Sequence, residues 1–208
     1  MQQNKWFIIE GNIGSGKTTL LEKLNENINY EVIKEPVDLW QNIKGDNNKN
    51  ILQSFYEDPK RYAYLFQTIV FKTRLQSLDH PQIKPVRFSE RSIWTDRNVF
   101  GKLCINMGNM NELEKNAYYS WFNWLEDKFF RKPDGIIYVY ATPTTCNKRM
   151  KERNRVEESE VPLEYLKETH KYHEEWLQNK HNVFIINNDD NDNWDEKIKQ
   201  IEVYIKSI

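Results

Sequence analysis

The sequence predicts an α/β fold in which helices flank a five-stranded parallel sheet. Five short runs rich in β-branched and aromatic residues recur along the chain, and stretches long enough for crossover helices separate them. The run from Ile136 to Tyr140 is apolar or aromatic at every position, which is typical of a central strand buried on both faces. A length of 208 residues fits a single domain, residues 1–208.

The expected strands lie at Trp6–Ile9, Glu31–Lys34, Val86–Ser89, Ile136–Tyr140 and Val183–Ile186. Two helical segments are the best defined, at Asn111–Phe130 and Pro162–Gln178, because apolar residues recur there at steps of three and four. In the first segment, the residues that approximate a helical stripe are Leu113, Ala117, Trp121, Trp124 and Phe129.

Two polar features have ordinary interpretations. His170 and His173 lie in the second helical segment, but no third ligand and no H-E-x-x-H pattern accompanies them. We therefore interpret them as residues of a helix face rather than as metal ligands. The Asn-rich stretch from Asn42 to Asn50 predicts a surface loop.

Charge, cysteine content and apolar runs exclude several classes of function. The formal net charge is −1, from 30 Lys and Arg against 31 Asp and Glu, so no basic excess is available to hold a nucleic-acid polymer. The two cysteines, Cys104 and Cys146, indicate a reduced, intracellular protein. No apolar run approaches the roughly 20 residues that span a bilayer, and Met1–Lys5 leaves no room for a targeting peptide. We therefore expect a cytoplasmic protein whose partners include neither a membrane nor a nucleic-acid polymer.

A glycine-rich loop follows the first strand and fits the pattern G-x-x-x-x-G-K-[ST]. Its glycines let the backbone wrap closely, so that successive N–H groups point at phosphate oxygens, and the helix that follows adds a favourable partial charge. The pattern predicts that Lys17 reaches the β- and γ-phosphates and that the Thr18 hydroxyl ligates Mg²⁺. The residues expected to bind the nucleoside triphosphate are Gly11, Asn12, Ile13, Gly14, Ser15, Gly16, Lys17, Thr18 and Thr19.

Charged motifs also come directly after the second and third strands, at the edge of a parallel sheet where ligands bind. Glu35 is placed to accept a proton from an attacking hydroxyl, and the alternative is a capping glutamate before Pro36. Glu90 is placed to hold the metal, and Arg91 to clamp a phosphate or a reacting oxygen. The alternative for this second motif is a surface ion pair.

Three arginines lie on and just after a helix that begins near Thr144. Arg149, Arg153 and Arg155 belong to a segment, about 149–160, that can act as a lid over transferring phosphates. A charged, solvated helix face is the alternative interpretation of the same run.

Together these residues resemble the deoxynucleoside kinase family, most closely its deoxycytidine/deoxyguanosine kinase branch. The resemblance runs nearly end to end and implies a P-loop kinase fold with an arginine-bearing lid. It rests on G-N-I-G-S-G-K-T-T (11–19), E-P-V-D-L-W (35–40), Y-E-D-P-K-R-Y-A-Y-L-F-Q-T (56–68), F-S-E-R-S-I-W-T-D-R (88–97), D-G-I-I-Y-V-Y-A-T-P (134–143), E-R-N-R-V-E-E (152–158) and P-L-E-Y-L (162–166).

The resemblance implies an enzyme of nucleotide salvage that moves the γ-phosphoryl of ATP to the 5′-hydroxyl of a deoxynucleoside, with Mg²⁺. It assigns catalysis to Glu35 as the base, with Arg91 and Lys17, and metal binding to Thr18 and Glu90. It assigns ATP contacts to the three lid arginines and places the stretch 187–194 around the donor adenine. The acceptor site it implies comprises Glu35, Trp40, Leu52, Phe55, Tyr56, Phe66, Gln67, Val70, Arg74, Arg91, Asp96, Phe100 and Glu158.

Within that site, Gln67, Val70 and Arg74 are spaced by three and four, so one helix face presents all of them. In the family, this arginine pairs with the residue at Asp96, and members that accept thymidine lack the pair. The resemblance therefore implies a preference for deoxycytidine, deoxyadenosine or deoxyguanosine over thymidine, and it leaves the ranking among these three open.

The nearest alternative is a nucleoside monophosphate kinase of the thymidylate kinase type, which usually shows D-R rather than the E-R found at 90–91. A nucleotide-regulated switch is a second alternative, but it would be expected to carry N-K-x-D, which the sequence lacks. The density of rings at Tyr118, Tyr119, Trp121, Phe122 and Trp124 exceeds one inward stripe and predicts a homodimer, as does the family resemblance.

Overall fold

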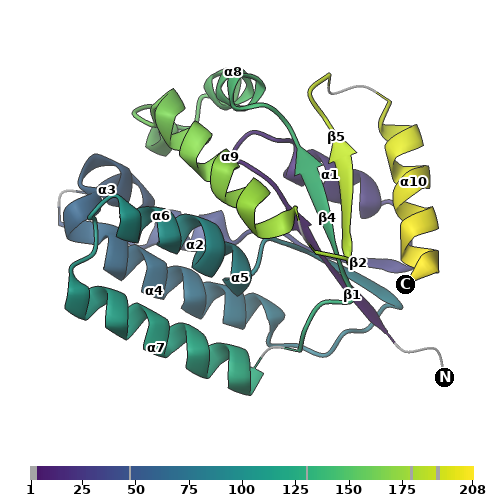
Figure 1. Cartoon of the computed structure of the whole chain (residues 1–208), viewed down its shortest axis with the longest axis horizontal. Coiled ribbons are helices and arrows are strands. Elements are labelled where there is room, and N and C mark those ends of the chain that lie inside the picture. The colour runs from purple at the N-terminus through teal and green to yellow at the C-terminus, as the bar shows by residue number, and fades with distance from the viewer. Residues whose placement is uncertain (1–3, 47, 130, 179, 191–192) are drawn as a thin grey trace.

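A five-stranded, all-parallel sheet forms the centre of the molecule (Figure 1). The computed structural model describes residues 4–46, 48–129, 131–178, 180–190 and 193–208. The strands are β1 (Lys5–Glu10), β2 (Tyr30–Ile33), β3 (Val86–Glu90), β4 (Gly135–Tyr140) and β5 (Val183–Asn187), in the order β2-β3-β1-β4-β5. All five predicted strands are confirmed, with ends shifted by one residue at most.

Helices make the crossovers between these strands and cover the sheet on both faces (Figure 1). They are α1 (Lys17–Leu24), α2 (Val37–Asn42), α3 (Ile51–Glu57), α4 (Pro59–Leu78), α5 (Ile93–Thr95), the π-helical η1 (Asp96–Phe100), α6 (Gly101–Asn106), α7 (Glu112–Phe129), α8 (Pro143–Arg153), the 3₁₀ turn η2 (Val156–Glu158), α9 (Leu163–Leu177) and α10 (Trp194–Ser207). The two predicted helical segments correspond to α7 and α9, and Phe130 lies outside the described residues.

Alternation along the strands sends side chains to two separate apolar clusters. On one face, Phe7, Ile9 and Ile137 pack with residues of α1 and α10, such as Leu20 and Ile201. On the other face, Ile136 and Tyr138 pack against Leu177 of α9. Burial on both faces explains the continuous apolar character of β4.

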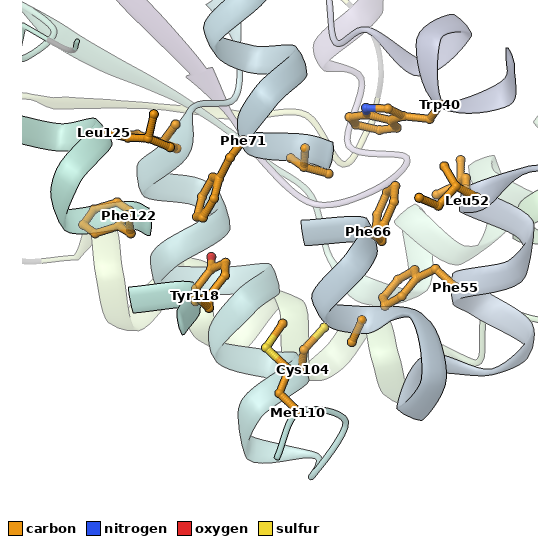
Figure 2. Packing of buried hydrophobic residues seen from close by; sticks show 14 residues of the cluster. Trp40, Leu52, Phe55, Phe66, Phe71, Cys104, Met110, Tyr118, Phe122 and Leu125 are labelled. Atoms are coloured by element: carbon orange, nitrogen blue, oxygen red, sulfur yellow. The ribbon is translucent and has the colours of Figure 1, made fainter. Parts of the chain in front are cut away.

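In addition to the two clusters on the sheet, a further apolar core lies away from the strands, where α4 packs beside α7 (Figures 1 and 2). Phe71 of α4 stacks on Tyr118 of α7 with ring centroids 4.9 Å apart. Phe122 and Leu125 extend the same buried face of α7 at steps of four and three.

The predicted stripe of α7 is therefore wrong. Leu113 is 78% exposed, Trp121 48% and Trp124 47%, and the side chain of Phe129 lies outside the described residues. The buried face is instead the one that begins at Tyr118. Rings lie on several faces of this helix, so apolar spacing alone could not select the inward one.

The segment 42–46 and 48–50 is largely exposed, as the prediction of a surface loop requires, and residue 47 is outside the described part. Its end is anchored, because Asn50 pairs with Lys44 in an isolated bridge and caps α3 by accepting from the N–H of Gln53. Among the described residues, no helix combines the length and apolar character that crossing a membrane requires.

Candidate active site

A pocket of about 590 Å³ opens at the carboxyl ends of the strands, between the phosphate loop, α4 and the lid. In an open parallel sheet, ligands bind at this edge where the strand order reverses, and here the reversal falls around β1. The pocket gathers every residue predicted for the acceptor site, along with both predicted metal ligands and the three lid arginines. Gly11, Asn12 and Ser15 are buried in the loop and do not line it, whereas Lys34, Val37, Asp38 and Tyr165 line it without having been predicted.

The phosphate loop depends on glycine backbone conformations. Gly14 and Gly16 have φ values of 78° and 101°, which L side chains rarely adopt. A Cβ on Gly14 would lie 2.5 Å from the carbonyl oxygen of Cys146, so α8 also closes off the space. Asn12 fastens the loop to α9 by donating from Nδ2 to the Leu166 carbonyl at 2.8 Å.

Lys17 is buried at the start of α1, and its Nζ donates to the Asn12 carbonyl at 2.8 Å. Burial lowers the pKa of Lys17 to about 8, and the positive charge of Arg91 adds to this effect, while Glu90 and Glu35 oppose it. Phosphate oxygens carry the negative charge that would restore the ammonium form, so this lysine is suited to bind them.

Thr18 and Glu90 bring oxygen ligands together beside the phosphate loop. The Thr18 hydroxyl donates to Oε1 of Glu90 at 3.1 Å. A hydroxyl and a carboxylate are the hard oxygen donors that Mg²⁺ prefers when phosphates complete its shell. The pair fits the predicted metal position.

Glu35 is held between two guanidinium groups. Arg91 Nη1 lies 2.9 and 2.8 Å from the two carboxylate oxygens, and Arg74 Nη2 lies 3.0 Å from Oε1. Burial alone would raise the pKa of Glu35, but the charges of Arg91, Arg74 and Lys17 outweigh it and lower the pKa to about 2. Glu35 is therefore ionised at neutral pH, and it lies in the pocket rather than capping a turn.

Arg91 stands on a tight turn after β3. Its φ is 59°, a left-handed conformation uncommon outside glycine, and its N–H donates to the Ile9 carbonyl at 3.0 Å. The guanidinium lies over the ring of Phe100, 4.6 Å from its centroid. The turn thus aims Arg91 into the pocket, which excludes the interpretation as a surface ion pair.

The pairing expected between Arg74 and Asp96 is present. Arg74 donates from Nε to Oδ2 of Asp96 at 2.7 Å and from Nη2 to Oδ1 at 3.2 Å, and both side chains are buried. Burial raises the pKa of Asp96 despite the nearby Arg74 charge. Gln67 and Val70 line the same side of the pocket, as the helical spacing predicted.

Gln67 presents a polar atom that the protein leaves unused. Its Oε1 is buried and has no hydrogen-bond partner within the part of the chain that the structure describes. A buried carbonyl oxygen without a donor is costly, so the amide is suited to a polar ligand edge.

Aromatic side chains form one wall of the pocket, and Figure 2 shows Trp40, Phe66 and Phe55 close together there. Phe66 stacks on Phe55 with centroids 4.9 Å apart and meets Trp40 edge-on at 5.3 Å. The Trp40 indole donates to the Thr73 hydroxyl at 3.0 Å, which fixes the ring against α4. These flat apolar faces suit a planar heterocycle.

Hydrogen bonds to a carboxylate and to a backbone carbonyl hold the three lid arginines. Glu158 accepts from Arg153 Nη2 at 2.5 Å and from Arg155 Nη1 at 2.8 Å, while Arg149 Nη2 donates to the Asp189 carbonyl at 2.8 Å. All three arginines line the pocket rather than forming only a solvated face. Tyr56 and Glu158, both predicted for the acceptor site, also line it.

Several structurally important residues were not predicted. Glu157 ties the lid to the other side of the pocket by accepting from Gln41 and Asn50 at 2.9 and 2.7 Å. Asn188 donates from Nδ2 to the Ser15 carbonyl at 2.7 Å, so part of the predicted stretch 187–194 supports the phosphate loop; residues 191–192 lie outside the described part.

This fold and site define a phosphate-loop kinase, with a triphosphate cradle, a lid and an acceptor pocket beside the strand ends. A family model described as deoxynucleoside kinase matches residues 7–208, and the chain belongs to that family. It is 37% identical over 198 residues to the mitochondrial deoxyguanosine kinase of Xenopus laevis, covering 86% of this chain and 75% of the relative.

Two human relatives match comparably. Deoxycytidine kinase of Homo sapiens is 39% identical over 197 residues, covering 83% of this chain and 75% of the relative. Mitochondrial thymidine kinase 2 of Homo sapiens is 40% identical over 169 residues, covering 81% and 63%. The resemblance predicted from the sequence is confirmed, and the chain is an ATP-dependent phosphotransferase rather than a nucleoside monophosphate kinase.

Proposed function

We propose that this kinase phosphorylates the 5′-hydroxyl of deoxycytidine, deoxyadenosine or deoxyguanosine in preference to thymidine. The observation that carries the proposal is the buried Arg74–Asp96 pair, which lies in the pocket on the same side as Gln67. The names of the relatives support the substrate class but not the ranking, because they include a thymidine kinase.

The base of the acceptor would bind between the aromatic wall and Phe100, with its polar edge on the Gln67 amide. An amide donates and accepts at once, as a base edge requires. Tyr56 and Glu158 would hold the 3′-hydroxyl from the lid side of the pocket. This orientation directs the 5′-hydroxyl toward Glu35 and the phosphate loop.

Glu35 and Arg91 would act at the reacting oxygen. The transfer forms a bond between the 5′-oxygen and the γ-phosphorus and breaks the bond from that phosphorus to the β–γ bridging oxygen. The electron pair of the broken bond leaves with ADP, and the hydroxyl proton passes to a carboxylate oxygen of Glu35. Lys17, Arg91 and the lid arginines would stabilise the charge on the phosphoryl oxygens.

Thr18 and Glu90 would hold Mg²⁺ beside the phosphates. Their oxygens lie 3.1 Å apart and share the pocket with Lys17. A metal ion bound there neutralises negative charge on the β- and γ-phosphates.

The Arg74–Asp96 pair explains the exclusion of thymidine in physical terms. Held against the base edge, it occupies the space that the 5-methyl of thymine needs. It also presents polar groups that a methyl cannot satisfy, and a buried unsatisfied group costs about 1–3 kcal/mol. Val70, branched and on the same helix face, narrows this region further.

The test is kcat/KM for the four natural deoxynucleosides. We expect thymidine to rank last with the unmodified enzyme and to rise in the double variant Arg74→Met with Asp96→Ala. Arg74→Met alone leaves the buried Asp96 carboxylate without its hydrogen-bonding partner, so that single variant should lose activity on all acceptors, whereas Asp96→Ala leaves Arg74 paired with Glu35. If thymidine ranks first with the unmodified enzyme, the specificity argument is wrong although the kinase assignment stands.

The proposal also includes a homodimer and a cytoplasmic location. The dimer is supported by the exposed rings of Trp121 and Trp124 on α7, and the location by the two cysteines, which are both free and buried. Fractionation of cells that express the tagged chain tests the location. Recovery in an organelle fraction would contradict it.

A further inference from the structure

A fully buried polar pair lies behind the phosphate loop, outside the residues assigned to the reaction. Glu10 ends β1 directly before Gly11, and His173 faces it from α9. Both side chains are 0% exposed. Glu10 Oε2 and His173 Nε2 lie 3.9 Å apart, and neither atom has a hydrogen-bond partner among the residues that the structure describes.

The hydrogen on His173 can be placed from its other nitrogen. Nδ1 lies 2.8 Å from the carbonyl oxygen of Thr169, and a carbonyl can only accept. Nδ1 therefore carries a hydrogen, and in the neutral ring Nε2 presents a lone pair. Burial lowers the pKa of His173 to about 3, because the Thr169 carbonyl does not offset the lost hydration and the charges of Arg91 and Lys17.

The opposite atom, Glu10 Oε2, must then be a donor. An ionised carboxylate would set its own lone pairs against that of Nε2 at a fully buried position, where such an arrangement is costly. Burial raises the pKa of Glu10 to about 7, which the hydrogen bond from Thr95 and the charges of Arg91, Arg74 and Lys17 only partly oppose. The charges of Arg91 and Lys17 also disfavour an imidazolium at His173. The titratable and charged groups that face the pair are Lys17, Arg74, Arg91, Tyr138 and His170.

The second oxygen of Glu10 connects this pair to the turn after β3 that carries Arg91. Oε1 accepts from the hydroxyls of Thr95 at 2.5 Å and Ser92 at 3.4 Å. Ser92 and Thr95 form the capping box that starts α5, immediately after Arg91 with its φ of 59°. A left-handed arginine persists only where its surroundings fix the backbone, and Glu10 supplies that fixation.

We propose that Glu10 is a neutral carboxylic acid that donates its hydrogen from Oε2 to Nε2 of His173, and that this bond positions the turn carrying Arg91. The present separation of 3.9 Å must shorten by about 1 Å to reach a normal hydrogen-bond distance. Glu10 and His173 are positioning residues, since neither lines the pocket. Because a neutral Glu10 carries no charge to compete for them, Lys17 and Arg91 remain available to the phosphates and to Glu35.

The first test compares two substitutions of the same residue. Glu10→Gln is neutral, accepts from Thr95 and Ser92 and donates to Nε2, so its kcat should stay within about threefold of the unmodified enzyme. Glu10→Ala should lower kcat by about tenfold or more, with the KM for the deoxynucleoside changed less than about threefold, because a misplaced catalytic group affects mainly the transition state. Glu26→Gln, exposed after α1, is the matched control and should change neither constant. A Glu10→Gln variant as slow as Glu10→Ala would overturn the proposal.

The second test is spectroscopic and does not depend on activity or on the proposed acceptor. The infrared difference between the unmodified protein and Glu10→Gln at pH 6 should contain the carbonyl stretch of a protonated carboxylic acid. Nitrogen NMR should show His173 with a hydrogen on Nδ1 alone. A carboxylate difference spectrum, or a His173 ring with both nitrogens protonated, would overturn the proposal even if Glu10→Ala does not fold.

Discussion

At the scale of single residues, the most informative group is Glu35. Two guanidinium groups hold its carboxylate, and its pKa of about 2 keeps it ionised from pH 5 to 9. A base this weak suits a reaction in which the proton leaves late, as in a loose phosphoryl-transfer transition state. The pH profile of kcat should therefore contain no acidic limb from Glu35 above pH 5.

Glu35→Gln tests this role. The amide keeps the shape of the side chain and one acceptor oxygen but cannot take the proton, so kcat should fall by about 10²–10⁴-fold while acceptor binding changes little. Steady-state kcat and a direct measurement of nucleoside binding separate the two effects. Glu31→Gln is the matched control, since Glu31 of β2 also pairs with an arginine, Arg87 of β3, but lies outside the pocket. Near-normal turnover of Glu35→Gln would remove Glu35 from the mechanism.

Sequence reasoning placed Glu35, Glu90 and Arg91 at the pocket but missed the contact between Glu10 and His173. Glu35, Glu90 and Arg91 follow strands directly, and the geometry of a parallel sheet brings such positions together. Glu10 and His173 are 163 positions apart and meet only because α9 crosses behind β1 and β4. No local pattern encodes such a contact.

At the scale of elements, the phosphate loop offers a prediction with an internal control. Gly14→Ala should abolish turnover, because its Cβ would collide with the backbone of α8 and its φ is 78°. Gly108→Ala has nearly the same backbone strain, with φ at 70°, but nothing lies within 4 Å of the added Cβ. This control should cost about 1–2 kcal/mol of stability and retain activity. Thermal unfolding and ADP release measure both properties, and comparable activity in the two variants would contradict the steric argument.

Helix α7 has a property that the sequence alone did not predict, namely which of its faces is buried. Its existence followed from periodicity and from Pro133 beyond its end, but the inward face did not. Tyr118 is buried because Phe71 of α4 stacks on it, which is a tertiary contact between residues 47 positions apart in sequence. The ambiguity arose because Trp121 and Trp124 have apolar rings on the outer face.

At the scale of the whole molecule, that outer face predicts association. Exposed aromatic rings are typical of interface centres, and Trp121 and Trp124 pack edge-on with centroids 5.8 Å apart. Light scattering at micromolar protein should therefore give about twice the chain mass of 25.2 kDa. Trp121→Lys should shift the mass toward the monomer, whereas Val203→Lys, at an exposed apolar position of α10, should not. A monomer mass for the unmodified chain would contradict the dimer.

The overall architecture was predictable because its signals are strong and redundant. Five β-rich runs, a phosphate-loop pattern after the first and long spacers between them permit few topologies. The strand order and the enclosure of the pocket by the lid were not predictable from local patterns. The enclosure depends on contacts such as the one from Asn50 to Glu157, which joins distant parts of the chain.

The most direct test of the account is ADP release with three acceptor conditions measured in parallel: deoxynucleosides, deoxynucleoside monophosphates and no acceptor. Gln67, the aromatic wall and Glu35 line one pocket, which we propose binds the deoxynucleoside. We predict rapid ADP release with deoxycytidine, deoxyadenosine or deoxyguanosine and only background release in the other two conditions. Faster release with the monophosphates than with any deoxynucleoside would contradict the assignment of the 5′-hydroxyl as the phosphoryl acceptor.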